Sequence, residues 1–358
     1  MEHISAEEKE EPPEAKKEQL PCTWPPAMSS RYKLRNKLGD GMFGEVYKAW
    51  DRVGKRLVAV KHLRGRPDAG FVPTNHHYFT RETMSLAACR GHPSIVNLVA
   101  THADETHDID GDFFVVTRYA GPLNLRQYMK LRSKQGRPFQ EHEVRDAMRQ
   151  LLSGAKHVHK KGVLHRDMVP ENVIVDKQSV RGEKMVYKIA GFGVSEPAVG
   201  AEKDGSAALA SPEPYRAPEL FLGSEDYDGR VDTWSLGCVM AELVTGDGGT
   251  APFFSADVEA EPVFKKVLRV VGTKGILEWP GLKLLARRDV AAELREKGCA
   301  SYAGCLRDMF PEEKLSEAGF EVLSGLLEPN PEHRLTAATA LRKPWFRRRG
   351  LGGGCFVP

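Results

Sequence analysis

The stretch VLHRDMVPEN, residues 163–172, decides the fold. Its tripeptide HRD is followed by an asparagine five residues after the aspartate, a spacing far more specific than a short glycine motif. The segments IAGFG, YRAPE, DTWSLG and EHR come after it, at 189–193, 215–219, 232–237 and 332–334. The probability that all of these segments occur by chance in this order along one chain is negligible.

Upstream lies a glycine-rich segment, LGDGMFGEV at 38–46. Its GxGxxG pattern lets a backbone approach phosphate groups closely. Dinucleotide-binding folds share this pattern but need a helix directly after it, whereas EVYKAWDRVGKRLVAVK reads as strand, turn and strand. Lys61 closes VAVK and could pair with phosphates, and Glu82, on a helix expected at 79–90, could orient it. Taken alone, these residues would also suit a surface turn and an ordinary strand lysine.

Hydrophobic periodicity divides the chain into two parts. From Tyr32 onward, apolar and polar residues alternate in short segments, which predicts a sheet that includes FFVVTRY at 113–119. Helical spacing dominates afterwards, at 123–132, 141–161, 231–245 and 316–328. The fold class predicted is α+β, with a small β-rich N-terminal lobe and a larger α-helical C-terminal lobe. The domain limits predicted are a disordered charged tail at 1–30, one domain at 31–346 with lobes 31–120 and 121–346, and a flexible tail at 347–358.

Composition excludes several classes of function. The 52 basic and 49 acidic side chains nearly balance, so charge makes no case for nucleic acid as a partner. No apolar run reaches the roughly 18 residues that a membrane span needs. The N-terminus is too charged for a signal peptide, and six scattered cysteines fit reduced thiols, so we expect an intracellular protein.

Together these motifs resemble the protein kinases, and YRAPELFLGSEDYDGRVDTWSLGCVMAEL at 215–243 is similar to the cyclin-dependent kinases. VPT at 72–74 ahead of TRE at 80–82 resembles their cyclin-facing helix, which implies a cyclin-like regulatory subunit. The resemblance implies a bilobal protein-kinase fold with ATP in the cleft between the lobes, and a protein substrate or partner. The residues it implies for nucleotide binding are Leu38, Gly39, Gly41, Gly44, Val46, Ala59, Lys61, Thr117, Arg118, Tyr119, Ala120 and Ile174.

The resemblance also assigns catalytic groups. Asp167 stands where the family has its catalytic base and Asn172 where it holds one magnesium ion, while Lys61 and Glu82 align the phosphates. Other matched residues have packing roles: Leu86, His165 and Phe192 in a regulatory stack, Asp232 beneath the catalytic loop, and Glu219 with Arg334 as a buried pair. For the activating phosphorylation site, Ser206 and Ser211 are the nearest hydroxyls. A phosphate on Ser206 could meet Arg166 and Arg81, whereas Ser211 could instead contact the catalytic aspartate.

Two departures from the family pattern put turnover and Mg²⁺ binding in doubt. Gly191 replaces the family's main metal-binding aspartate, Val169 replaces its phosphate-contacting lysine, and Glu171 stands where tyrosine kinases place an arginine. If each loss costs about 3 kcal/mol, each slows transfer about a hundredfold, or about four orders of magnitude together. Two hypotheses stay open: a nucleotide-binding pseudokinase, and an active serine/threonine kinase that uses Asp167 with a weak metal site.

Overall fold

The computed structural model describes residues 24–41, 44–64, 75–103, 111–178, 184–198, 211–246, 253–254, 262–285 and 302–347. These residues belong to two compact units. The N-terminal unit runs to Pro122 and also includes Ala190–Ser195, and the C-terminal unit holds Leu123–Ile189 and the chain from Glu196 onward. The predicted lobe boundary at residue 120 therefore moves to Pro122, and the return of Ala190–Ser195 to the first unit was not expected.

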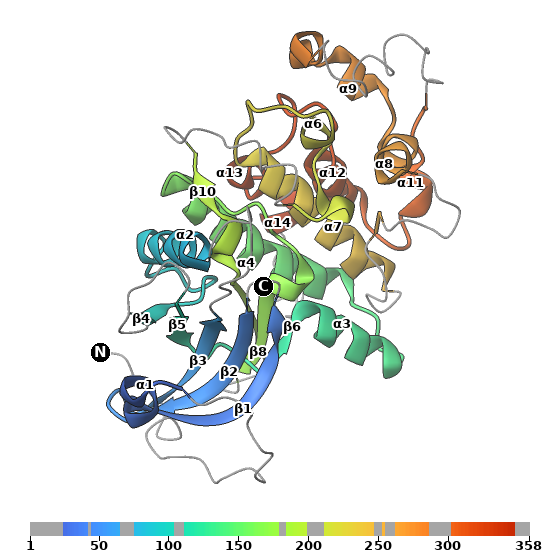
Figure 1. Ribbon diagram of the computed structural model, residues 1–358. Coiled ribbons are helices and arrows are strands. Elements are labelled where there is room, and N and C mark those ends of the chain that lie inside the picture. The colour runs from blue at the N-terminus through green and yellow to red at the C-terminus, as the bar shows by residue number, and fades with distance from the viewer. Residues whose placement is uncertain are drawn as a thin grey trace, which may run out of the picture. The chain divides into compact units, whose positions relative to one another are not determined.

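A five-stranded antiparallel sheet forms the N-terminal unit, in the order β1-β2-β3-β5-β4 (Figure 1). Its strands are β1 Tyr32–Gly41, β2 Gly44–Asp51, β3 Arg56–Leu63, β4 Leu98–Ala103 and β5 Phe113–Arg118. The alternation of apolar and polar residues that predicted this sheet reflects its two different faces. The predicted α+β class, with a β-rich first part and a helical second part, is confirmed.

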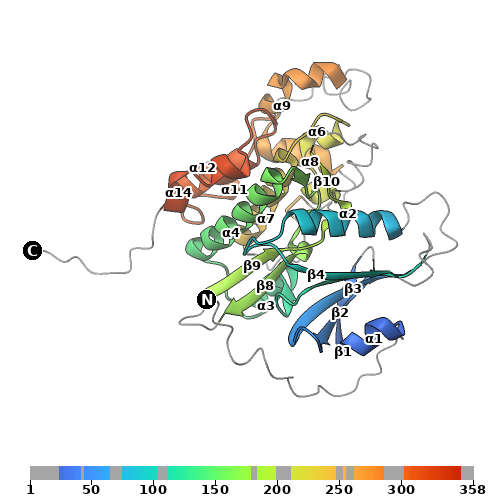
Figure 2. The same ribbon diagram turned by 90° about the vertical axis from the view of Figure 1, so that its left-hand side faces the viewer.

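Helix α2, Asn75–Ala88, packs on one face of this sheet (Figure 2). Phe79 of the helix stacks on Phe113 of β5, with ring centroids 4.8 Å apart. The helix also contacts the short turn η3, Phe192–Val194, which explains why Ala190–Ser195 belongs to this unit. Since side chains alternate along β5, Phe114 and Val116 point to the opposite face, where they join a second apolar cluster.

That opposite face is covered by helix α1, Pro26–Arg31, and by the residues just before it. Trp24 meets Tyr47 edge-on, with ring centroids 5.9 Å apart, and Met28 is 1% exposed. The Arg31 guanidinium lies 3.2 Å from the fully buried carboxylate of Asp51. The prediction that the disordered tail extends to residue 30 is therefore wrong for 24–30, because its low average hydrophobicity concealed two apolar anchors. Residues 1–23 lie outside the described part of the chain.

The C-terminal unit is built around helix α7, Arg230–Thr245, whose residues from Val231 to Leu243 are all buried. Helices α4, Glu141–Lys160, and α12, Glu317–Leu326, pack against it. Helix α3, Leu125–Lys134, begins with a capping box between Asn124 and Gln127 that satisfies backbone groups at its start. The remaining helices are α6 Pro218–Phe221, α8 Val263–Val271, α9 Lys274–Glu278, α11 Leu306–Met309, α13 Ala337–Ala340 and α14 Pro344–Arg347, with 3₁₀ turns η2 Pro170–Asn172, η4 Glu213–Tyr215 and η5 Pro280–Leu285.

Two small sheets complete this unit. Strands β6 Leu123–Asn124, β8 Val173–Gln178 and β9 Lys184–Ile189 form one, and β7 Val163–Leu164 pairs with β10 Glu196–Pro197 to form the other. The helices predicted at 141–161, 231–245 and 316–328 are confirmed within two residues at each end. No helix in the described ranges is both long and apolar enough to cross a membrane.

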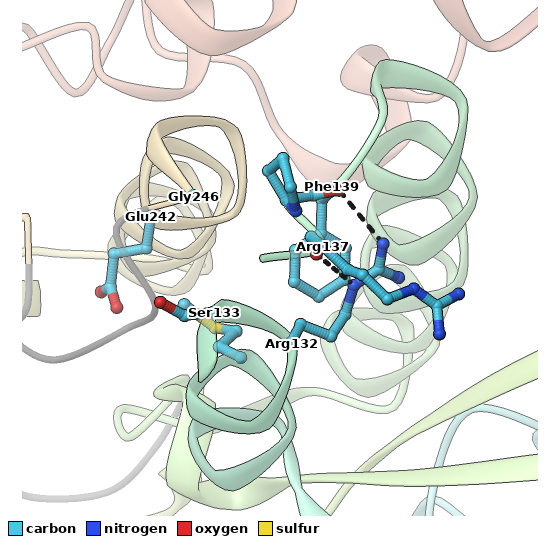
Figure 3. A pocket seen from close by; sticks show the side chains of 8 residues that line it. Arg132, Ser133, Arg137, Phe139, Glu242 and Gly246 are labelled. Atoms are coloured by element: carbon cyan, nitrogen blue, oxygen red, sulfur yellow. Dashed lines mark hydrogen bonds between the residues drawn. The ribbon is translucent and has the colours of Figure 1, made fainter. Parts of the chain in front are cut away.

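The connection from α3 to α4 is fixed by Arg132 (Figure 3). Its guanidinium donates to the carbonyl oxygens of Arg137 and Pro138 and to the carboxylate of Glu143. A cavity beside it measures about 10 Å³, which is room for about one water molecule. Arg132 thus holds the connection between the two helices by hydrogen bonds, and the cavity is too small to hold a substrate.

Candidate functional site

Most of the residues expected to bind nucleotide share one face of the N-terminal sheet. The antiparallel register sets Val46 opposite Lys61, and Ala59 opposite Thr117. Directly opposed residues project to the same side, and Ala59 and Lys61 are two apart on β3, so all four lie on the face that carries α2. Gly39, opposite Val46, belongs to the same face. The sheet therefore brings these predicted residues together.

Lys61 and Glu82 form the ion pair that the sequence predicted. Lys61 Nζ lies 2.6 Å from Glu82 Oε2, and the two side chains are 15% and 6% exposed. At this distance and burial the contact is a charge-assisted hydrogen bond, roughly twice as strong as a neutral one. The carboxylate holds a lysine that would otherwise be flexible, so the cation keeps a fixed position on the sheet face.

The three glycines of the segment 38–46 differ in the space that a Cβ would find at each position. A Cβ on Gly39 would meet no atom within 4 Å, so the space beside it is open to an approaching ligand. Gly44 instead has a φ of +152°, and a Cβ there would lie 2.1 Å from the carbonyl oxygen of His62. Gly44 is thus required by the close approach of β3, whereas no neighbouring atom requires glycine at position 39, and its phosphate-binding role stays a prediction. Gly41 is intermediate, with a Cβ 3.2 Å from the Gly44 carbonyl oxygen.

The remaining residues predicted for nucleotide binding lie within strands or just after them. Leu38 sits in β1 at a shift of register, and Arg118 and Tyr119 donate their backbone N–H groups to the carbonyl oxygens of Asn97 and Leu57. Ala120 follows in the same segment. Ile174, the twelfth residue of the predicted set, lies on β8 of the C-terminal unit, opposite Asn124 and Lys188.

In the C-terminal unit, Asp167 is braced by Asn172. The Asn172 Nδ2 amide donates to the Asp167 carboxylate at 2.6 Å and to its carbonyl oxygen at 3.0 Å. The backbone N–H of Asp167 donates to His165 Nδ1 at 3.2 Å. These bonds fix the carboxylate, which is the requirement for a base that must accept or orient a hydroxyl proton.

The loop that carries Asp167 is anchored from below by Asp232, as predicted. The Asp232 carboxylate accepts the backbone N–H groups of His165 at 2.9 Å and Arg166 at 2.7 Å, and contacts His159 Nε2 at 2.8 Å. Burial alone would raise the pKa of Asp232, but the hydrogen bond to His159 and the nearby histidines hold it below its ordinary value. A fixed negative charge therefore organises the backbone immediately before Asp167.

The other residues with predicted packing roles are paired or buried within their own units. Glu219 and Arg334 form a two-pronged ion pair at 2.7 and 2.8 Å, as predicted. Leu86 and Phe192 are both buried in the N-terminal unit, and His165 is buried in the C-terminal unit. Ser211 Oγ donates at 2.6 Å to the carbonyl oxygen of Arg166, the residue immediately before Asp167. Ser206 and residues 72–74 lie outside the described ranges.

Gly191 and Val169 stand in environments that differ from each other. Gly191 has φ 77° and ψ 48°, the left-handed conformation, and begins the η3 turn without any side chain. Val169 is 6% exposed and packs as part of the core. The first position therefore offers a bare backbone, and the second offers a buried aliphatic group. Neither supplies charge to a phosphate or a metal ion.

The residues present fit a magnesium ion poorly. Mg²⁺ prefers oxygen ligands, chiefly carboxylates and water, in octahedral geometry. Asn172 could contribute its amide oxygen, but the Asp167 carboxylate already accepts a hydrogen bond from the Asn172 amide nitrogen, and Gly191 contributes no carboxylate. Within the described ranges, no group of three or more His, Cys, Asp or Glu side chains could hold a metal ion.

Sequence reasoning missed the role of Arg126, at the start of α3. Its guanidinium donates to Glu171 at 2.9 Å, and also to Glu242 and the hydroxyl of Tyr215. Burial raises the pKa of Glu242, which Arg126 opposes by its positive charge. Glu171 is thus neutralised by a residue 45 positions earlier, and no local pattern could have revealed that pairing.

Comparison with known proteins gives a consistent result. The pattern of the family described as "Protein kinase domain" matches residues 32–346. A rice (Oryza sativa subsp. japonica) protein described as "Putative cyclin-dependent kinase F-2" is 42% identical over 318 residues, covering 88% of this chain and 90% of the relative. "Cyclin-dependent kinase G1" of Arabidopsis thaliana is 32% identical over 328 residues, covering 88% of this chain and 49% of the relative. "Cyclin-dependent kinase B2-2" of Arabidopsis thaliana is 29% identical over 320 residues, covering 89% and 94%. The chain thus spans about half the length of the G1 relative.

Proposed function

Because the chain belongs to the protein kinase family, with a domain of the cyclin-dependent-kinase-like serine/threonine type, we propose that it binds ATP but transfers phosphate only very slowly. Such a domain acts as a nucleotide-responsive scaffold, a pseudokinase, whose binding partner is a cyclin-like or kinase protein. The single observation that carries this proposal is the pair of replacements at Gly191 and Val169. At both positions the transferring phosphoryl group, which is highly anionic, would meet no compensating charge.

Nucleotide binding is supported by the N-terminal unit. Lys61 is held at 2.6 Å by Glu82, on the sheet face shared with Val46 and Ala59. Open space at Gly39 lets a phosphate approach the backbone. A fixed lysine pairing with the α- and β-phosphates requires no metal ion, so affinity for ATP can persist where transfer does not.

Transfer is weakened because only part of the machinery is present. Asp167, braced by Asn172, would orient the acceptor hydroxyl and take its proton. A magnesium ion, when bound, would neutralise charge on the phosphates, but the donors present fit it poorly. Losing about 3 kcal/mol at each of the two positions gives a rate about four orders of magnitude below that of an ordinary kinase.

The alternative function is an active ATP-dependent kinase acting on serine or threonine in proteins. The ordered pairs Lys61–Glu82 and Asp167–Asn172 favour it, because both are arranged as catalysis requires. In this case Asn172 would hold a weakly bound metal ion. The alternative differs from the scaffold in one measurable quantity, the rate of phosphate transfer.

The similarity to proteins described as cyclin-dependent kinases and the segment TRE at 80–82 on α2 support a cyclin-like partner. Residues 72–74, the other part of that resemblance, lie outside the described ranges.

The experiment combines binding and transfer. The thermal stability of the purified chain is followed during titration with ATP, with and without magnesium, and radiolabel transfer to a protein substrate is then measured. Stabilisation by ATP without need for magnesium, together with transfer about four orders of magnitude slower than that of an ordinary kinase, supports the scaffold. Transfer at an ordinary rate that is abolished by Asp167→Asn supports the kinase and rejects the scaffold.

A further inference from the structure

Arg166, the arginine of HRD, lies entirely inside the C-terminal unit. Its side chain is 0% exposed, and its backbone has a positive φ of 67°. This conformation is unfavourable for an L-residue other than glycine, so it persists only where the surroundings determine it. Its N–H is bound by Asp232 and its carbonyl oxygen by Ser211, so the residue before Asp167 is held through its backbone on both sides.

The side chain of Arg166 has an internal carboxylate partner, Glu196. Arg166 Nη1 lies 2.7 Å from Glu196 Oε2, and the hydroxyl of Tyr227 donates to Glu196 Oε1 at 2.5 Å. Glu196 is 3% exposed. Burial, and then the hydrogen bond with Glu196, raise the pKa of Tyr227, so its hydroxyl stays a donor. Each carboxylate oxygen therefore has its own buried donor.

The backbone holds Glu196 at this place. Strand β10 pairs with β7, which sets Glu196 opposite Leu164, two residues before Arg166. Strand pairing and ion pair thus tie the same two segments together. A buried guanidinium needs an anion, since an unpaired buried charge is strongly destabilising. The anion can be a carboxylate built into the chain or a phosphate added to it.

We propose that Glu196 is the built-in counter-ion of Arg166 and holds the catalytic loop in place without phosphorylation of Ser206. Glu196 and Arg166 are positioning residues, which act on Asp167 through the backbone of 164–167. A phosphate on Ser206 would have to displace a buried carboxylate that already has two donors. The role of Asp167 in phosphate transfer rests on the proposed function. The geometry of the loop does not depend on it.

The test is hydrogen–deuterium exchange on the full chain, treated with phosphatase and free of nucleotide. Glu196→Gln keeps the shape but removes the charge, and we expect exchange in 163–172 to accelerate about tenfold or more. Glu196→Asp, which retains the charge, is expected to restore most of the protection. Glu219→Gln is the matched control, because it breaks an ion pair of nearly the same burial in the same unit. It is expected to lower Tm while leaving exchange in 163–172 unchanged.

Three results would overturn the inference. The alternative, in which a phosphate is the counter-ion of Arg166, predicts that the loop of the dephosphorylated wild type exchanges as fast as the loop of Glu196→Gln. It also predicts that Ser206→Ala, in protein isolated with its phosphates, loses protection, whereas we expect no change. If Glu196→Gln does not fold, Tyr227→Phe removes one donor from the same carboxylate, and unchanged exchange in 163–172 would contradict the proposal. Because no nucleotide is present, these results leave the proposed function untouched.

Discussion

Restoring the two missing charges should restore measurable transfer. The perturbation is Gly191→Asp together with Val169→Lys, which returns a carboxylate to the metal-binding position and a cation to the phosphate-contacting position. If each charge is worth about 3 kcal/mol in the transition state, the ideal gain is about ten-thousandfold. The structure indicates that the observed gain will be smaller, for a different reason at each position.

At Gly191, φ is 77°, and aspartate adopts this left-handed conformation at a cost of about 1 kcal/mol. At Val169, the side chain is 6% exposed, so lysine loses apolar packing and must extend its ammonium group toward water. Both costs lower stability and make the positions of the two introduced side chains less precise. We therefore expect a gain of at least tenfold in the double variant.

The assay is radiolabel transfer from ATP to a protein substrate with magnesium present, comparing wild type, both single variants and the double variant. Adding Asp167→Asn to the double variant is the control, because any restored transfer must depend on the base. A folded double variant whose transfer does not rise above that of the wild type would refute the reasoning. The cause of slow transfer would then lie outside these two positions.

Three further predictions follow from individual contacts. Glu82→Gln should weaken ATP binding about tenfold by leaving Lys61 without its anionic partner, measured by thermal-shift titration, and unchanged affinity would contradict the role given to the pair. Trp24→Ala should lower the free energy of unfolding by about 3 kcal/mol in denaturant titration, and a change near zero would show that residues before α1 do not stabilise the sheet. The pKa of Glu141 is lowered below 4.5, because hydrogen bonds from Ser316 and Trp345 outweigh the effect of burial. Its contribution to stability is therefore present above pH 4.5 and is lost as the pH falls through the folded pKa, so the Tm deficit of Glu141→Gln should shrink at low pH, and a constant deficit would contradict this assignment.

The sequence was sufficient where a contact follows from motif order or local periodicity. The pairs Lys61–Glu82 and Glu219–Arg334 and the anchor Asp232 were all predicted. Each belongs to an ordered set of motifs, so its members could be identified before any geometry was known. The amphipathic helices followed from their 3.6-residue period, because burial of one face produces that pattern.

The contacts that could not be predicted join segments that carry no motif. Arg166 and Glu196 are 30 residues apart, and their pairing depends on the β7–β10 strand pair, which is too short to show a period. Trp24 and Met28 were hidden in a segment of charged composition, although each buries its side chain. Two apolar anchors in an otherwise polar stretch do not produce the average hydrophobicity on which a prediction of disorder depends.

The most direct test of the central claim is the rate of phosphate transfer by the purified wild-type chain, measured beside its ATP-induced thermal stabilisation. We predict clear stabilisation by ATP and a transfer rate about four orders of magnitude below that of an ordinary serine/threonine kinase. Transfer at an ordinary rate, lost on Asp167→Asn, would contradict the account, because Gly191 and Val169 would then have to be harmless.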